Sequence, residues 1–92
     1  MASTIKMEVP VVQNTHRQLT NINNALRQQI QQARNQVKNT VPGAWQGDSA
    51  TEFEARFEEW AQQATRLCDQ MDQLLQVLNN EINQWIEMAR TL

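Results

Sequence analysis

Apolar residues in the first half of the chain recur at steps of three and four, which predicts an amphipathic helix. They are Leu19, Ile22, Leu26, Ile30, Ala33, Val37 and Val41. These steps form an eleven-residue repeat, which is close to the natural helical period and favours a nearly straight helix. Asn and Gln occupy most positions around this stripe. Because the stripe continues unbroken through them, we interpret these amides as a solvated helix face rather than as a low-complexity segment.

The second half of the chain carries two neighbouring apolar rows. The first row, with steps of three and four, is Ala50, Phe53, Phe57, Trp60, Ala64, Leu67, Met71, Leu74 and Leu78. The second row, with steps of seven, is Ala61, Cys68, Leu75, Ile82 and Ala89. One row can face the first helix of a hairpin, but two adjacent rows are too wide for that alone. We therefore expect another chain to bury the surplus row, so that the protein dimerises.

A short turn separates the two helical patterns. Pro42 lacks an N–H donor and should end the first helix just before it. Gly43 can adopt the left-handed conformation that often follows a helix end. Ser49 and Glu52 have the capping-box spacing that begins a helix, and Asp48 is a competing cap. The sequence therefore predicts a helix, a turn and a second helix.

The distribution of charge supports an antiparallel hairpin. Residues 1–42 hold five of the eight basic side chains and one of the ten acidic ones, and residues 43–92 hold the rest. In a hairpin, position i of the first helix should lie opposite roughly position 90 − i of the second, which makes the two halves neighbours of opposite sign. Each exposed ion pair contributes only ~0.2–1 kcal/mol, so charge favours this pairing without driving it.

The predicted architecture is a single all-α domain, residues 1–92, folded as a two-helix antiparallel hairpin. We expect helices near 8–41 and 49–90, joined by a turn at 42–48.

No group of side chains predicts catalysis, a cofactor or a metal site. His16 is the only histidine, and no Cys or second His lies near it at a metal-ligand spacing. Glu58 and Glu59 are adjacent on a helix and diverge by about 100°, which is unsuited to paired acid–base work. Cys68, the only cysteine, lies in an apolar row without a flanking base, so we expect a packing residue. We therefore expect a protein that is not an enzyme.

Membrane and nucleic-acid binding are also disfavoured. No apolar run approaches the ~18 residues that a membrane span needs, and the start "MASTIKMEVP" has no apolar region typical of a Sec signal peptide. Trp85, Ile86 and Met88 cluster near the carboxy terminus, but the acidic second helix argues against binding to anionic lipid. The basic residues of the first helix are interspersed with amides and not with aromatics, so we expect no nucleic-acid partner.

The turn also holds Trp45, Gln46 and Gly47, which neither helix boundary requires. A Trp-x-Gly tripeptide between two long amphipathic helices, in a chain of about this length, resembles the WXG-hundred family. These are the early-secreted-antigen-like (ESX) substrates of bacterial type VII secretion. The resemblance covers essentially the whole chain. It implies a hairpin that pairs with a second, antiparallel hairpin into a four-helix bundle, and export of the folded dimer from the cytoplasm without a Sec signal peptide.

The family pattern also has a carboxy-terminal export element, an aromatic residue followed four residues later by an acid. The nearest candidate is Trp85, but the fourth residue after it is Ala89, and Glu87 comes two residues early. Either Trp85 acts in a degenerate signal, or a partner chain supplies the signal. The resemblance assigns export recognition to the turn tripeptide together with Trp85, with Gly47 serving a close approach or a positive φ. A purely structural alternative is Trp45 as a hydrophobic plug at the hairpin end.

The resemblance and the two apolar patterns together give the expected partners. A second copy of the chain is the first choice, a second small Trp-x-Gly protein is the next, and the type VII secretion ATPase is implied by the family. The alternative function is a cytoplasmic helical-bundle adaptor or chaperone-like partner that is not itself exported. The residues expected in the core or at the dimer interface are Leu19, Ile22, Leu26, Ile30, Phe53, Phe57, Trp60, Leu67, Met71, Leu74 and Leu78.

Overall fold

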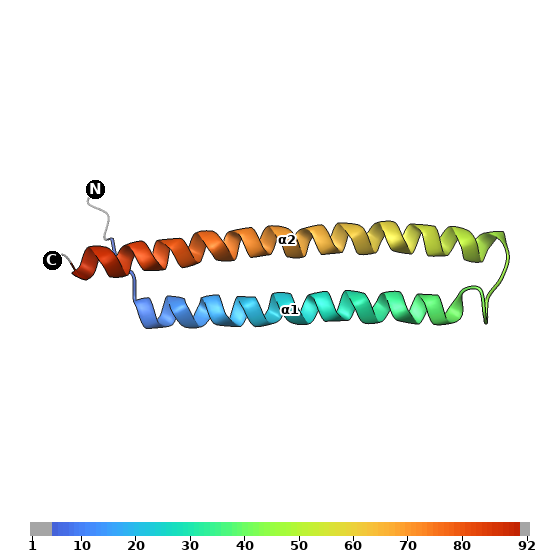
Figure 1. Cartoon of the computed structure of the whole chain (residues 1–92), viewed down its shortest axis with the longest axis horizontal. Helices are drawn as coiled ribbons and strands as arrows, with labels where there is room; N and C mark the ends of the chain where they lie inside the picture. The colour runs from blue at the N-terminus through green and yellow to red at the C-terminus, as the bar shows by residue number, and fades with distance from the viewer. Residues whose placement is uncertain (1–4, 91–92) are drawn as a thin grey trace.

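The computed structural model describes residues 5–90, which form two long helices, α1 (Val9–Thr40) and α2 (Asp48–Arg90). The helices lie side by side and antiparallel, with the turn at one end of the rod and the start of α1 and the end of α2 at the other (Figure 1). The principal extents are 68 × 25 × 17 Å. This architecture confirms the predicted all-α hairpin. Neither helix in the described part of the chain has a stretch long and apolar enough to cross a membrane.

Two side chain–backbone contacts define the register of the hairpin. His16 Nε2 lies 3.1 Å from the Leu75 carbonyl oxygen, and Asn23 Nδ2 donates to the Cys68 carbonyl oxygen at 3.1 Å. In both pairs, position i of α1 lies opposite position 91 − i of α2. The predicted register, with position i opposite 90 − i, therefore differs from the observed one by one residue. The line along which the two helices contact is called the seam below.

The seam is built from the smaller of the two rows of α2. The buried members of that row are Ala61, Cys68, Leu75 and Ile82. Ala61 and Cys68 form a cluster with Ile30 of α1, against which Phe57 and Ala64 pack. The small side chains of Ala61 and Cys68 allow the two backbones to approach closely. The larger row of α2 lies mostly beside the seam and partly exposed, but its first member, Ala50, is buried.

The seam row of α1 shares Ile30 and Val37 with the apolar stripe but otherwise departs from it. The buried residues of α1 are Asn23 and Ile30, which are seven residues apart and continue a seven-residue spacing from His16 to Val37. Ile22 belongs to the apolar stripe but is 62% exposed. The amides interpreted as a solvated helix face are all exposed: Gln13, Asn14, Gln18, Asn21, Asn24, Gln28, Gln31, Gln32, Asn35 and Gln36. Asn23, which is not one of them, is buried and hydrogen-bonded to α2.

The end of α1 follows the proline rule. Val41, which precedes Pro42, is extended, with φ −114° and ψ 123°, as expected for a residue before proline. The Thr40 carbonyl then accepts hydrogen bonds from the backbone N–H groups of Ala44 (2.8 Å) and Trp45 (3.0 Å). These two bonds satisfy a carbonyl at the helix end and tie the backbone of Trp45 to α1.

One expectation for the turn is confirmed and two are wrong in detail. Gly47 has the expected positive φ, at 118°, whereas Gly43 does not adopt the left-handed conformation. The first hydrogen bond of α2 runs from the Thr51 N–H to the Gly47 carbonyl at 3.1 Å. Gly47 is therefore the N-cap residue, and α2 begins at Asp48, so the Ser49 capping box does not form the helix start. A glycine N-cap is among the accepted choices at this position, and only glycine adopts this φ without strain.

Substitution of the two glycines should separate backbone strain from crowding. A Cβ at Gly47 would meet no atom within 4 Å, whereas one at Gly43 would make an ordinary 3.7 Å contact with the Asn39 carbonyl. We expect Gly47→Ala to lower the free energy of unfolding by roughly 1–2 kcal/mol because of its positive φ, and Gly43→Ala to change it by less than about 0.5 kcal/mol. Urea denaturation at one fixed protein concentration measures both. Equal effects of the two substitutions would contradict this assignment.

Candidate functional site

A strip of four aromatic rings runs from the turn onto α2. The ring centroids of Trp45 and Phe53 are 5.6 Å apart, those of Phe53 and Phe57 are 6.3 Å apart, and those of Phe57 and Trp60 are 5.6 Å apart. These separations lie in the range of favourable aromatic pairs. Trp45 is 41% exposed, so its ring is anchored on Phe53 and still accessible to a partner.

Next to Trp45 the helix ends enclose a mainly apolar groove of about 330 Å³. It is lined by Gln36, Val37, Thr40, Val41, Trp45 and Phe53. The groove means that Trp45 does not fill the hairpin end completely. A half-exposed ring beside an open groove is a feature of a contact surface.

The predicted export residues lie at opposite ends of the rod. Trp45, Gln46 and Gly47 form the turn, and Gln46 is exposed. Trp85 is half-buried near the end of α2, at the open end of the hairpin (Figure 1). A single hairpin therefore does not bring Trp85 to the Trp-x-Gly turn.

Several large apolar side chains of both helices are exposed. On α2 the exposed fractions of Phe53, Trp60, Leu67 and Leu74 range from 45% to 64%. On α1, Leu26 and Ile22 are also exposed. Half-buried residues lie beside them: Leu19, Ala33, Phe57, Ala64, Met71 and Leu78. Of the residues expected to pack in the core or at a dimer interface, Ile30 is buried within the hairpin.

Ion pairs occupy one side of the seam. Successive residues of a helix are rotated by about 100°. The residues one and four positions after a residue of the seam therefore both lie on the same side of the seam. Arg27 is four after Asn23, and Asp69 and Asp72 are one and four after Cys68. Arg27 Nη2 donates to Asp69 Oδ1 at 2.8 Å and also to Asp72 Oδ2. These contacts show that the corresponding sides of the two antiparallel helices meet.

The exposed apolar residues occupy the other side of the seam. The residues one position before and three positions after a residue of the seam lie on the side away from the ion pairs. Such positions are occupied by Ile22, Leu26, Leu67 and Leu74. Because the charged sides of the two helices meet, the apolar sides must also meet on the opposite surface. Together with Phe53 and Trp60, these four residues form one continuous surface across both helices, called the apolar face below.

The ion pairs of the charged side form within the hairpin, although Arg34 Nε is buried without a hydrogen-bond partner. Nearer the turn, Arg34 Nη2 pairs with Glu58 Oε1 at 3.0 Å. The hydrogen bonds of Arg27 with Asp69 and then Asp72 raise the pKa of its guanidinium, while desolvation opposes the shift. Arg27 is therefore charged throughout the physiological pH range. The hairpin thus has one side of paired charges and one side of unpaired apolar surface.

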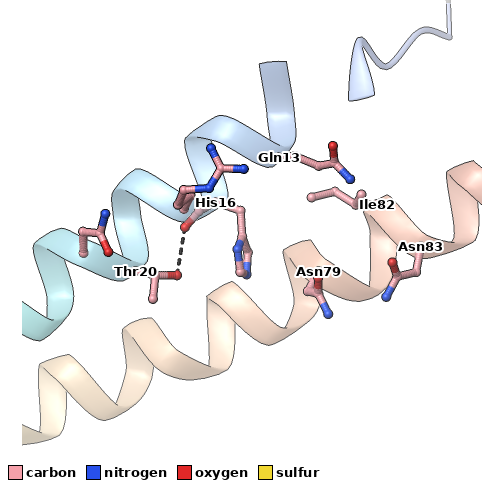
Figure 2. A pocket seen from close by; sticks show the side chains of 8 residues that line it. Gln13, His16, Thr20, Asn79, Ile82 and Asn83 are labelled. Atoms are coloured by element: carbon pink, nitrogen blue, oxygen red, sulfur yellow. Dashed lines mark hydrogen bonds between the residues drawn. The ribbon is translucent and has the colours of Figure 1, made fainter. Parts of the chain in front are cut away.

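A polar groove of about 390 Å³ lies near the open end (Figure 2). Thr20 Oγ1 donates to the His16 carbonyl at 2.8 Å, and Asn79, Ile82 and Asn83 line the groove from α2. The remaining lining residues are Gln13, Arg17 and Asn21. The groove offers amide groups but no carboxylate beside His16. Among residues 5–90, no cluster of three or more His, Cys, Asp or Glu side chains could hold a metal ion.

Asn23 is the residue that the sequence interpretation missed. It was one of many amides around the apolar stripe, and residue type alone did not distinguish it. Its position in the sequence does distinguish it. Asn23 lies seven residues before Ile30 and fourteen before Val37, and this seven-residue spacing is the same as that of the seam row of α2. Matching the two seven-residue rows would have placed this amide between the helices.

Comparisons with known proteins agree with the geometry described above. No curated protein and no solved structure gives a match. One family model does match, over residues 4–85, and its description is proteins of 100 residues with WXG. The matched region contains α1, the turn and most of α2. The two-helix hairpin with Trp45 and Gly47 in its turn places the motif between long helices, and the chain belongs to the WXG100 family.

Proposed function

We propose that this protein is a small, non-enzymatic substrate or co-exported partner of a type VII (ESX) secretion system, and that it acts as a dimer of hairpins. The observation that carries the proposal is the apolar face, which one hairpin leaves open. Family membership supports the secretion route, because the WXG-hundred family consists of such substrates. In this proposal the protein is exported from the cytoplasm without a Sec signal peptide.

A second copy of the chain is the proposed occupant of the apolar face. The interhelix ion pairs of Arg27 and Arg34 lie on the opposite side, so two copies can join their apolar faces without bringing those charges together. The middle of the apolar face on α2 consists of Leu67 and Leu74, with the half-buried Met71 between them, and these side chains are suited to helix–helix packing. A second small Trp-x-Gly protein with a similar face is the next candidate.

Antiparallel pairing of the two hairpins would complete the export signal. Each turn would then approach the open end of the other chain, so that Trp45 of one copy lies near Trp85 of the other. The half-exposed Trp45 ring supports a role in recognition more than one as a buried plug. The type VII secretion ATPase is the proposed reader of this composite surface. In a dimer of two copies Trp85 acts in a degenerate signal, whereas a different Trp-x-Gly partner would supply an acid that this chain replaces with Ala89.

Charge placed on the apolar face should separate the dimer. We expect the double substitution Leu67→Glu and Leu74→Glu to weaken dimerisation at least about a hundredfold, because each Leu loses ~1.5–3 kcal/mol of burial. The matched control is Gln70→Glu with Gln73→Glu, which adds the same charge at exposed positions of α2 away from the apolar face. Sedimentation velocity over a concentration series measures both dissociation constants. An unchanged constant in the leucine variant would exclude this face as the interface.

Replacement of Trp45 should stop export but not folding. We expect Trp45→Ala to cost roughly 1–2 kcal/mol of stability, less than full burial would imply, since the ring is 41% exposed. Secretion is measured as protein in the culture medium against a cytosolic lysis marker. Gln28→Ala, at an exposed position of α1 outside the turn, is the control and should be exported normally.

Two outcomes would contradict different parts of this proposal, the first the role of Trp45 and the second secretion itself. Normal secretion of Trp45→Ala would remove Trp45 from the export signal. Retention of the unchanged protein in cells with an active type VII system would instead favour the cytoplasmic adaptor.

A further inference from the structure

Asn23 is a buried polar residue in the middle of the seam. Its side chain is 4% exposed, and Nδ2 donates to both the Cys68 carbonyl at 3.1 Å and Asp72 Oδ1 at 2.8 Å. A buried amide is tolerated only where such partners exist, because an unpaired one is costly. Asn23 therefore fits the seam in the observed orientation of α1 and in few others.

The carboxylate of Asp72 extends this contact to the next turn of α1. Its Oδ1 accepts from Asn23 and its Oδ2 accepts from Arg27 Nη2. Arg27 Nη2 also donates to Asp69 Oδ1 at 2.8 Å. Asn23, Arg27 and Asp72 are called the polar cluster below. It attaches two successive turns of α1 to one side of α2.

Apolar burial within the single hairpin favours a different orientation of α1. A rotation of α1 about its own axis by roughly 40° would centre its apolar stripe on the seam, at about 100° per residue. Leu26 and Ile22 would then be buried against α2 and Asn23 would leave the seam. In the observed orientation these two residues are 48% and 62% exposed. The polar cluster holds the orientation that leaves more apolar surface open.

We infer that the polar cluster, and Asn23 above all, is a positioning element that fixes the rotation of α1 and thereby directs Ile22 and Leu26 onto the apolar face for pairing with a second hairpin. A buried Asn that selects one helix arrangement at a cost in stability is known from coiled coils. The consequence for pairing rests on the proposed function, whereas the rotation is a property of one hairpin.

A disulfide-trapping experiment tests the rotation directly and uses the native Cys68. Ile22→Cys places a thiol on the apolar face, turned away from the seam, so an intrachain bond to Cys68 should form slowly. A disulfide needs Cα atoms about 4.4–6.8 Å apart and facing Cβ vectors. With Asn23→Leu added, α1 should reach the rotated state, and we expect the bond to form at least tenfold faster in oxidised glutathione.

The matched control for this experiment is Asn24→Leu with Ile22→Cys, since Asn24 is the next residue and is exposed. It should form the bond no faster than Ile22→Cys alone. Mass spectrometry of unreduced peptides from mixed ¹⁵N-labelled and unlabelled protein distinguishes intrachain from interchain bonds. A folded Asn23→Leu protein that forms the bond no faster than the control would overturn the inference.

A second measurement separates positioning from a merely structural role. The single Asn23→Leu substitution should leave the unfolding midpoint unchanged or higher, yet raise the dimer dissociation constant at least tenfold. A lower midpoint with an unchanged dissociation constant would contradict the inference. If circular dichroism shows Asn23→Leu to be unfolded, the unfolding midpoint and the dimer dissociation constant are measured for Asp72→Asn instead, because this substitution keeps the side-chain size. If the unchanged chain is monomeric, the dimer proposal fails while the trapping comparison still decides the rotation.

Discussion

Two helices that lie side by side can bury only a narrow strip of each other, and this constraint governs the rest of the structure. The strip of α2 that faces α1 contains Ala61 and Cys68, whose small side chains allow close approach. The larger residues beside them, such as Trp60 and Leu67, are left exposed. Within residues 5–90, a rod 68 Å long and 17 Å across its narrowest extent, no third element covers them. In the proposed dimer a partner takes that place.

Charge and hydrogen bonding decide which surface that partner meets. The seam-facing row of α1 includes His16 and Asn23 as well as Ile30, so polar contacts share the work of joining the helices. Ion pairs collect on one side of the seam and apolar side chains on the other. An individual exposed ion pair adds little stability, but the position of these pairs defines the two sides of the hairpin. At the turn, backbone hydrogen bonds to Thr40 and the conformation of Gly47 hold Trp45 at the tip.

The sequence predicted the helices and their pairing well because apolar periodicity and charge act over many residues. It left open which row of α2 faces α1. The spacing of apolar residues does not show that Ala and Cys let two helices approach more closely than Phe and Leu do. The turn was less predictable, because Gly43 and Gly47 carry the same local signal, and a shift of only two residues separates a Ser49 cap from a Gly47 cap. Asn23 was missed because an amide in an amide-rich helix is identified as buried only once the opposite helix is in register.

The central claim is that the apolar face of one hairpin pairs with that of another along the length of the rod. The most direct measurement is the solution mass of the unmodified chain by light scattering, combined with its shape by small-angle X-ray scattering. The account predicts twice the chain mass of 10.7 kDa and a particle about as long as one hairpin, because the two rods lie side by side. A particle of 10.7 kDa that unfolds cooperatively at micromolar concentration would contradict it.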